Sequence, residues 1–264
     1  MGKYIISILL SFSSLISNGQ TMTWKLKDSI AYSVNELYID RLNQIYLFPK
    51  NEHVLIKLNE DLSINQEYSS PFISQFVFMD VKNPMKVLMY LPQFSNVNVL
   101  DESLTILSEE YFSDFNNESS ICYFSANQLC YYSKNKINIR DLQNRNLKSS
   151  EPILYKQRVE TEISQIKSNG QDIFLLLPKT GLWHFNSFLN LESYVEDYEI
   201  KRIELMDNEL YLLKNDNISI WKPTELSDQI LFASKKQKIY SFAINKKYLL
   251  IALDNKILRY NLSN

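Results

Sequence analysis

The sequence predicts an all-β fold made of six similar four-stranded units. One observation is a recurring segment, as from Asn43 to Leu58: a turn residue, an apolar strand, a polar break and a strand that alternates apolar and polar residues. This pattern is typical of a half-buried hairpin. The other is a repeat of about 40 residues, marked by one turn residue in each unit: Asn43, Asn83, Asn127, Asn169, Asn208 and Lys247. That period is typical of a propeller blade, so we expect a six-bladed β-propeller of antiparallel blades.

The first three units follow this template in order. In the first unit we expect strands at Glu36–Arg41, Gln44–Phe48, Val54–Leu58 and Ile64–Tyr68. In the second unit we expect them at Gln75–Asp80, Lys86–Leu91, Asn96–Leu100 and Thr105–Tyr111. In the third unit we expect them at Ser120–Phe124, Gln128–Ser133, Lys136–Asp141 and, as a weak fourth strand, near Arg145–Lys148.

The fourth and fifth units come after a longer connection through Pro152 to Arg158. The fourth has expected strands at Glu162–Lys167, Asp172–Leu177, Leu182–Phe185 and Leu191–Glu196. The fifth has them at Lys201–Met206, Glu209–Lys214, Ile218–Trp221 and Gln229–Ala233. Proline follows the second strand in units one, two and four, where a strand must end because Pro has no N–H to donate: Pro49, Pro92 and Pro178.

The sixth unit has only three expected strands, at Ile239–Ile244, Tyr248–Leu253 and Ile257–Leu262. An alternating segment from Thr23 to Ile30 precedes the first unit without belonging to it. We expect this N-terminal strand, about residues 22–30, to complete the last blade. Pairing there would also cover a sheet edge that is otherwise open to aggregation.

Composition and charge agree with one globular domain. The chain has 264 residues, of which 45% are hydrophobic and 13% aromatic, so it can bury a large core. The formal net charge is −2 and no basic block occurs, so we expect no nucleic-acid partner. Only four glycines are present, and the turns must therefore rely on residues such as Asn and Asp, which tolerate the left-handed backbone conformation.

The first 19 residues have the features of a signal peptide. Lys3 supplies a positive start, and Tyr4 to Ile16 is apolar with serines. Ser17-Asn18-Gly19 then puts small residues at the −3 and −1 positions of a cleavage site. We expect cleavage before Gln20, a single mature domain at 20–264, and a location in the periplasm or on the outer cell surface. The alternative is a buried first strand or a membrane anchor, although the apolar segment is shorter than the ~20 residues that span a bilayer. No later segment is long and apolar enough to cross one.

At this point the chain resembles the exported bacterial six-bladed β-propellers of the broad NHL/WD40-like type. The resemblance rests on segments such as Leu37 to Leu47, with the sequence LYIDRLNQIYL, and covers the mature chain. It implies architecture and no particular activity. The Asp of the NHL-like pattern matches Asp40 and loosely Asp80, and neither a Trp-Asp blade ending nor a kelch double glycine is present.

One face of the expected ring carries the candidate interaction residues. Loops between second and third strands, and the connections between blades, emerge on the same face, and those of units two and four are large. They carry aromatic and basic residues of the types that anchor protein interfaces: Phe94, Phe115, Tyr155 and Arg158. The alternative is that the aromatic rings pack beneath their own loops. We expect a non-catalytic scaffold without a cofactor, which binds another protein of the cell envelope as part of an envelope or secretion-associated complex.

Two other functions compete with this one. A metal-dependent hydrolase, like the lactonase-like propellers that hold calcium in the channel, would need several oxygen ligands there. The inner strands offer carboxylates with Lys167, Lys201 and Arg202 among them: Glu36, Asp40, Asp80, Glu162, Glu204 and Asp207. A carbohydrate-binding module would stack sugars on Tyr90, Phe94 or Tyr155.

The histidines and cysteines give no catalytic pattern. His53 and His184 belong to different units, so neither a histidine-based triad nor a zinc site is expected. Cys122 and Cys130 fall on neighbouring strands of one hairpin, so they form either a disulfide or two buried thiols on opposite faces of the sheet.

Overall fold

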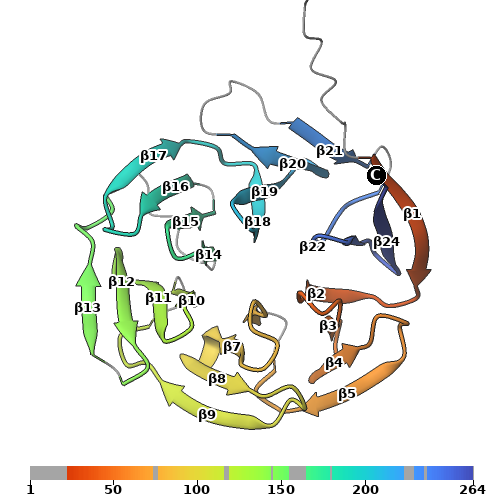
Figure 1. Ribbon diagram of the computed structural model, residues 1–264, viewed down its shortest axis with the longest axis horizontal. Helices are drawn as coiled ribbons and strands as arrows, with labels where there is room; N and C mark the ends of the chain where they lie inside the picture. The colour runs from red at the N-terminus through yellow and green to blue at the C-terminus, as the bar shows by residue number, and fades with distance from the viewer. Residues whose placement is uncertain are drawn as a thin grey trace, which may run out of the picture.

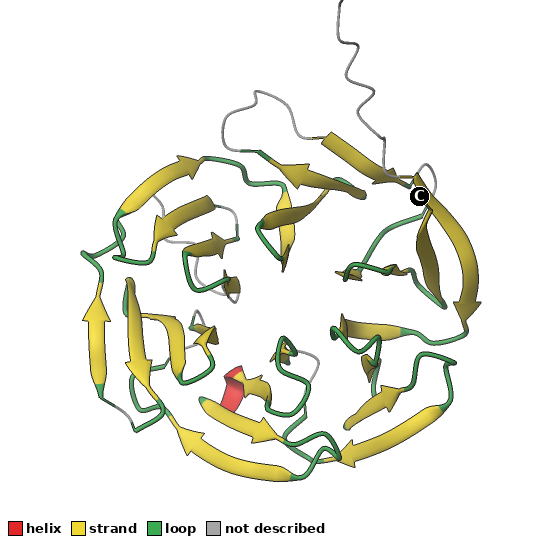
Figure 2. Cartoon of the chain, viewed as in Figure 1, coloured by secondary structure: helices red, strands yellow, loops and turns green. Residues whose placement is uncertain are grey.

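The computed structural model describes residues 23–73, 77–115, 119–143, 145–154, 165–178, 180–222, 229–234 and 237–263. Within these residues the chain forms six antiparallel four-stranded sheets, arranged as blades around a central axis (Figure 1). Strands make up nearly all the regular structure, and the short helical turn η1 (Pro92–Phe94) is the exception (Figure 2). The predicted six-bladed propeller is confirmed.

The blades follow one another along the chain. Blade one contains β2 (Val34–Ile39), β3 (Ile45–Pro49), β4 (Val54–Leu58) and β5 (Ile64–Ser69). Blade two contains β6 (Phe78–Asp80), β7 (Val87–Leu91), β8 (Asn96–Leu100) and β9 (Ile106–Tyr111). Blade three contains β10 (Ser120–Ser125), β11 (Gln128–Ser133), β12 (Lys136–Asp141) and β13 (Asn146–Ser149).

Blade four contains β14 (Gln165–Ser168), β15 (Asp172–Leu177), β16 (Gly181–Asn186) and β17 (Leu191–Val195). Blade five contains β18 (Ile200–Met206), β19 (Glu209–Lys214), β20 (Asn217–Trp221) and β21 (Gln229–Ala233). Blade six contains β22 (Ser241–Ile244), β23 (Tyr248–Ala252), β24 (Ile257–Ser263) and β1 (Thr23–Ile30). The starts of the predicted strands at Gln75 and Glu162, and the predicted cleavage site before Gln20, lie outside the described residues.

The first strand of each blade lies nearest the axis and the last lies at the rim (Figure 1). The second strands β3, β7 and β23 are buried along their whole length, whereas β9 and β13 at the rim are mostly exposed. Both faces of a middle strand pack against neighbouring blades, so these strands are apolar throughout and do not alternate. In the described residues, no helix has the length and apolar character needed to cross a membrane.

The N-terminal strand completes blade six, as the sequence predicts. β1 pairs with β24 in antiparallel register, with Trp24 opposite Leu262 and Ile30 opposite Ile257. Arg259 of β24 binds Asp28 of β1 and also donates to the backbone carbonyl of Glu60 in blade one, at 2.5 Å. The pairing of β1 with β24 therefore closes blade six, and Arg259 links this blade to blade one.

A five-residue turn recurs between strands and explains how the chain folds with few glycines. In the turns that begin at Asp101, Asp141 and Asn186, the side-chain oxygen of the first residue accepts the backbone N–H of the third and fifth residues. The fourth residue of such turns has positive φ, as at Leu104 (φ 60°) and Leu189 (φ 67°). That backbone costs an L-residue about 1–2 kcal/mol, which the turn's hydrogen bonds and the burial of the leucine offset.

Cys122 and Cys130 lie directly opposite each other in the β10–β11 pair. Both are free and buried in the same core cluster. The expectation of thiols on opposite faces of the sheet is therefore wrong, because residues that oppose each other across an antiparallel pair share a face.

Candidate functional site at the axis and on the loop face

Charged side chains of the inner strands meet at the axis. Arg202 of β18 donates to Oε1 of Glu204 from Nε at 3.1 Å and from Nη2 at 2.9 Å, and it also binds Glu36 of β2. Lys167 of β14 donates to the other oxygen of Glu204 at 2.8 Å, and the hydroxyl of Ser241 in β22 donates to Glu36 at 3.3 Å. This network, which we call the axial network, joins blades one, four, five and six.

Burial sets the electrostatics of the axial network. Loss of solvation raises the pKa of Glu36, and the nearby charge of Arg202 opposes that rise. Burial alone would lower the pKa of Arg202, but the charges of Glu36 and Glu204 outweigh it and raise the pKa above its usual value. Arg202 therefore stays charged, and its charge stabilises the carboxylates of Glu36 and Glu204.

The carboxylates considered as metal ligands have other partners. Asp40 accepts the backbone N–H groups of Leu42 and Gln44, at 2.8 and 2.9 Å, and the hydroxyl of Tyr46. Burial raises the pKa of Asp40.

Asp80 accepts the backbone N–H groups of Lys82 and Tyr123, at 3.0 and 2.8 Å, and Asp207 pairs with Lys246 at 3.0 Å. Glu162 lies outside the described residues. Among the residues that the structure describes, no three His, Cys, Asp or Glu side chains form a group that could hold a metal ion.

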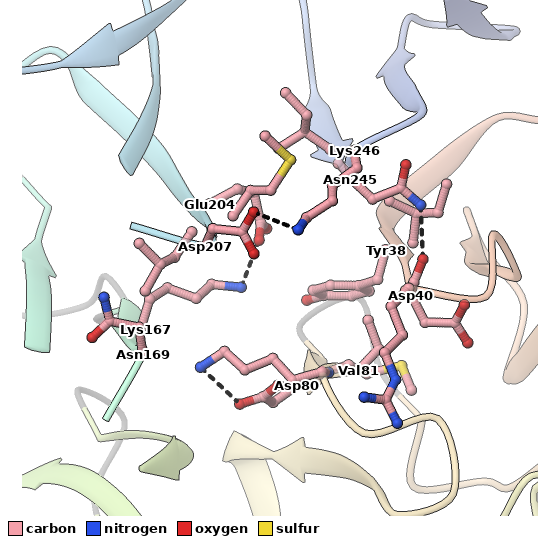
Figure 3. A pocket seen from close by; sticks show the side chains of 18 of the residues that line it. Tyr38, Asp40, Asp80, Val81, Lys167, Asn169, Glu204, Asp207, Asn245 and Lys246 are labelled. Carbon is pink, nitrogen blue, oxygen red and sulfur yellow. Dashed lines mark hydrogen bonds and ion pairs between the residues drawn. The ribbon is translucent and has the colours of Figure 1, made fainter. Parts of the chain in front are cut away.

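A cavity of about 870 Å³ opens at the axis, and we call it the axial cavity. It lies on the face of the ring that carries the turns between first and second strands, which we call the turn face. Figure 3 shows Lys167 and Lys246 reaching toward its middle, where the ring of Tyr38 lies. Asparagines of these turns join across blades at its mouth: Asn169 donates to Asn208 at 3.1 Å, and Asn245 donates to Asn43 at 3.0 Å.

The axial cavity is the feature that sequence reasoning missed, although its signal is in the repeat. Asn43, Asn169 and Asn208 mark the repeat because each occupies a turn between the first and second strands. In a propeller these turns all emerge near the axis on one face. The residues around them, such as Arg41 and Lys246, could therefore have been assigned to a shared cavity.

The opposite face, which we call the loop face, carries Phe94, one of the predicted interaction residues. Phe94 of η1 is 42% exposed and packs edge-on against Phe72, 49% exposed, with ring centroids 5.0 Å apart. The two rings come from different connections, one within blade two and the other between blades one and two. Tyr111, also exposed, lies at the same end of blade two, because it pairs with Asn96 two residues after Phe94.

Phe115, a second predicted interaction residue, does not add an exposed ring to this face. Phe115 is buried against Tyr90, Phe112 and Tyr131, so this part of the prediction is corrected: the ring packs beneath its own loop, where the core offers three aromatic neighbours. Tyr90, proposed as a sugar-stacking platform, is fully buried. Tyr155 and Arg158 lie outside the described residues.

Neither histidine lines the axial cavity. His184 in β16 contacts Asp172 through Nε2 at 2.8 Å and stacks on Phe174, with centroids 4.7 Å apart. His53 contacts the backbone carbonyl of Ile73 through Nδ1 at 2.5 Å. Both have structural neighbours in the blades.

No family model matches the sequence, and no curated protein sequence is significantly similar to it. Solved structures are similar in fold. A catalytically inactive histidine-to-alanine variant of virginiamycin B lyase from Staphylococcus aureus, with quinupristin, superposes with a TM-score of 0.60 and 8% identity, over 92% of this chain and 99% of that one. Raptor from Chaetomium thermophilum gives a TM-score of 0.63 and 11% identity, over 92% of this chain and 29% of that one. BamB from Moraxella catarrhalis gives 0.58 and 9%, over 91% and 100%. At these identities the comparisons establish a shared propeller fold alone.

Proposed function

We propose that this chain is a non-catalytic propeller that binds another protein of the cell envelope through its loop face. The observation that carries the proposal is the exposed aromatic pair of Phe72 and Phe94. Their ring centroids lie 5.0 Å apart, and the two residues belong to different connections between strands. Exposed apolar side chains gathered on a rigid surface mark interaction sites, and aromatic rings contribute most per residue at such sites.

The closed ring makes the loop face a suitable platform. Phe94 sits on η1, whose first residue, Pro92, is buried, and Ser95 closes the turn with its N–H on the carbonyl of Pro92 at 3.1 Å. Ser95 also accepts the N–H of Phe112 at 2.9 Å, which ties this loop to the next connection. A loop fixed in this way loses little conformational freedom when a partner binds.

The axial site supports binding over catalysis. A general base or nucleophile needs a neighbouring group that activates it and a position that a substrate can reach. At the axis Glu36 and Glu204 are held by Arg202, and Asp40 and Asp80 accept backbone N–H groups. Both histidines of this chain lie away from the axial cavity, in contact with the partners described above.

The first 19 residues have the pattern of an export signal and support the proposed placement in the envelope. We propose that the mature chain begins at Gln20. N-terminal sequencing of the protein from a periplasmic or surface fraction tests this placement. Recovery of the intact N-terminus from the cytoplasm would overturn it.

Capture with matched variants tests the function itself. Tagged protein with Phe72→Ala and Phe94→Ala is compared with wild type, and with Phe188→Ala as the control, because Phe188 is 74% exposed on the turn face. After mild cross-linking in envelope extracts, we expect one envelope protein to be captured by wild type and Phe188→Ala and lost from the double variant. Equal capture by all three, or none by wild type, would refute the proposal.

A further inference from the structure

The axial cavity has more unused hydrogen-bond donors than acceptors. Its asparagine side-chain oxygens already accept hydrogen bonds, as those of Asn43, Asn169, Asn208 and Asn245 show. Glu204 uses one oxygen for Arg202 and the other for Lys167. Most of the side-chain acceptor groups that line the cavity are therefore occupied, although Asp207 uses only one oxygen, for Lys246.

The donors are less fully used. The guanidinium of Arg41 makes no hydrogen bond or ion pair with the part of the chain that the structure describes. Lys167 and Lys246 each contact one carboxylate, at 2.8 and 3.0 Å, although an ammonium group has three N–H donors. Lys82 differs, because its amino group is taken up by Asp80 and by the backbone carbonyls of Ser168 and Tyr123.

The walls between these polar groups are apolar. Met79, Val81, Leu205 and Ile244 line the axial cavity. The centroid of the Tyr38 ring lies 5.7 Å from the amino group of Lys167 and 5.1 Å from the guanidinium carbon of Arg202. A volume of about 870 Å³ falls within the ordinary range for small-molecule sites. The site therefore suits a molecule with a carbon skeleton and acceptor groups at its ends.

We propose that the axial cavity binds an organic carboxylate through Arg41, Lys167 and Lys246. An ionised carboxylate is acceptor-only, which matches the excess of donors, and guanidinium groups bind it with two parallel N–H bonds. Arg and Lys side chains also bind phosphate, but the apolar walls of this cavity favour an anion with a carbon skeleton. The carboxylate comes either from a free small acid or from an acidic side chain of a polypeptide.

Calorimetric titration of the intact mature protein tests the proposal with three probes: succinate, inorganic phosphate and hexaglutamate. We expect a carboxylate probe to bind and phosphate to bind at least about tenfold more weakly. Succinate binding indicates a free acid, and hexaglutamate binding about tenfold tighter than that of succinate indicates a polypeptide source; both support the site. Failure of both carboxylates to bind, or phosphate binding as tight as theirs, would overturn it.

Two exposed substitutions locate the site without touching the buried network. Arg41→Gln together with Lys246→Gln removes two donors, and each lost charged hydrogen bond weakens binding by about tenfold. The control is Lys134→Gln, because Lys134 is an exposed lysine paired with Asp114 on the loop face, as Lys246 is paired with Asp207 on the turn face. Unchanged affinity in the double variant would place the carboxylate elsewhere and overturn the proposal.

This second site is independent of the proposed function. Phe72→Ala with Phe94→Ala changes the loop face, so we expect full carboxylate affinity in that variant. If this variant loses protein capture but still binds carboxylate, both proposals are supported. If it also loses carboxylate binding, the two sites are not separate, and the proposal of an independent axial site is overturned.

Discussion

Arg259 and Asp28 form an ion pair with two N–H···O contacts, 231 residues apart in the chain, with Nε to Oδ1 at 2.8 Å and Nη2 to Oδ2 at 2.5 Å. The pair crosses the one place where the ring is not closed by sequential strands, between β24 and β1. Arg259 is almost completely buried, and its remaining nitrogen binds blade one. We therefore expect the stability of the ring to depend on this contact.

Breaking the closure pair is expected to destabilise the whole fold. Asp28→Asn leaves the buried guanidinium of Arg259 without its counter-charge. We expect the free energy of unfolding to fall by about 1–3 kcal/mol. This is less than the cost of breaking a wholly buried pair, because Asp28 is partly exposed. The control is Asp254→Asn, which breaks the more exposed pair of Asp254 with Lys50 and is expected to cost less than about 1 kcal/mol. Urea unfolding of both variants measures this, and equal effects would contradict the role of the closure.

Removing Arg202 is expected to destabilise the axis in a pH-dependent way. Arg202→Met removes the cation that binds Glu36 and leaves this carboxylate beside Glu204, which keeps Lys167 as its partner. The expected cost is about 3–5 kcal/mol at neutral pH. Burial raises the pKa of Glu36, and the variant removes the charge that opposes that rise. A raised pKa in the folded state favours folding at low pH and loses that contribution as the pH rises. The deficit in unfolding free energy relative to wild type should therefore be smaller at pH 4.5 than at pH 7.5, and an equal deficit at both would argue against the account.

Glu60 is expected to titrate at unusually low pH. Hydrogen bonds from Lys247 and Tyr248 lower its pKa from 4.5 to about 2. A lowered pKa contributes stability above the unfolded-state value of 4.5, and this contribution is lost as the pH falls from there toward 2. The carboxyl carbon shift of Glu60 in NMR spectra should therefore move mainly below pH 3. When the pH falls from 5 to 2, the free energy of unfolding should decrease less in Glu60→Gln than in wild type. An NMR titration midpoint near pH 4.5 for Glu60 would show that these contacts do not form.

The two cysteines are expected to be unreactive in the folded protein. Both thiols are buried, and burial raises the pKa of Cys130, so little thiolate forms at neutral pH. Ellman's reagent should detect no thiol in the native protein and two after unfolding in denaturant without reductant. Fast reaction of the native protein would show that the hairpin opens, and absence of thiols after unfolding would show a disulfide.

Much of the fold follows from the sequence because a propeller repeats one local pattern. The spacing from Asn43 to Lys247 gives the number of blades, and alternation from Thr23 to Ile30 marks a strand that needs a partner. The pairing of β1 with β24 then follows, since only the last blade lacks a fourth strand. Local periodicity and one open edge are enough to fix this architecture.

The loop-face and axial sites are harder to predict from the sequence, because they depend on contacts between blades. Nothing local distinguishes Phe94, which is exposed, from Phe115, which three aromatic rings of blades two and three cover. One of the two carboxylate partners of Arg202, Glu36, likewise lies 166 residues away in the chain. Repeat spacing places residues on a blade, but the side chains of neighbouring blades decide which of them remain exposed.

Photocrosslinking at single positions tests directly whether the loop face binds an envelope protein. A photoreactive phenylalanine analogue is placed at position 94 on the loop face in one sample and at position 188 on the turn face in another. The account predicts that irradiation of cells gives one adduct with an envelope protein at position 94 and none at position 188. An adduct at position 188 alone, or no adduct at position 94, would contradict it.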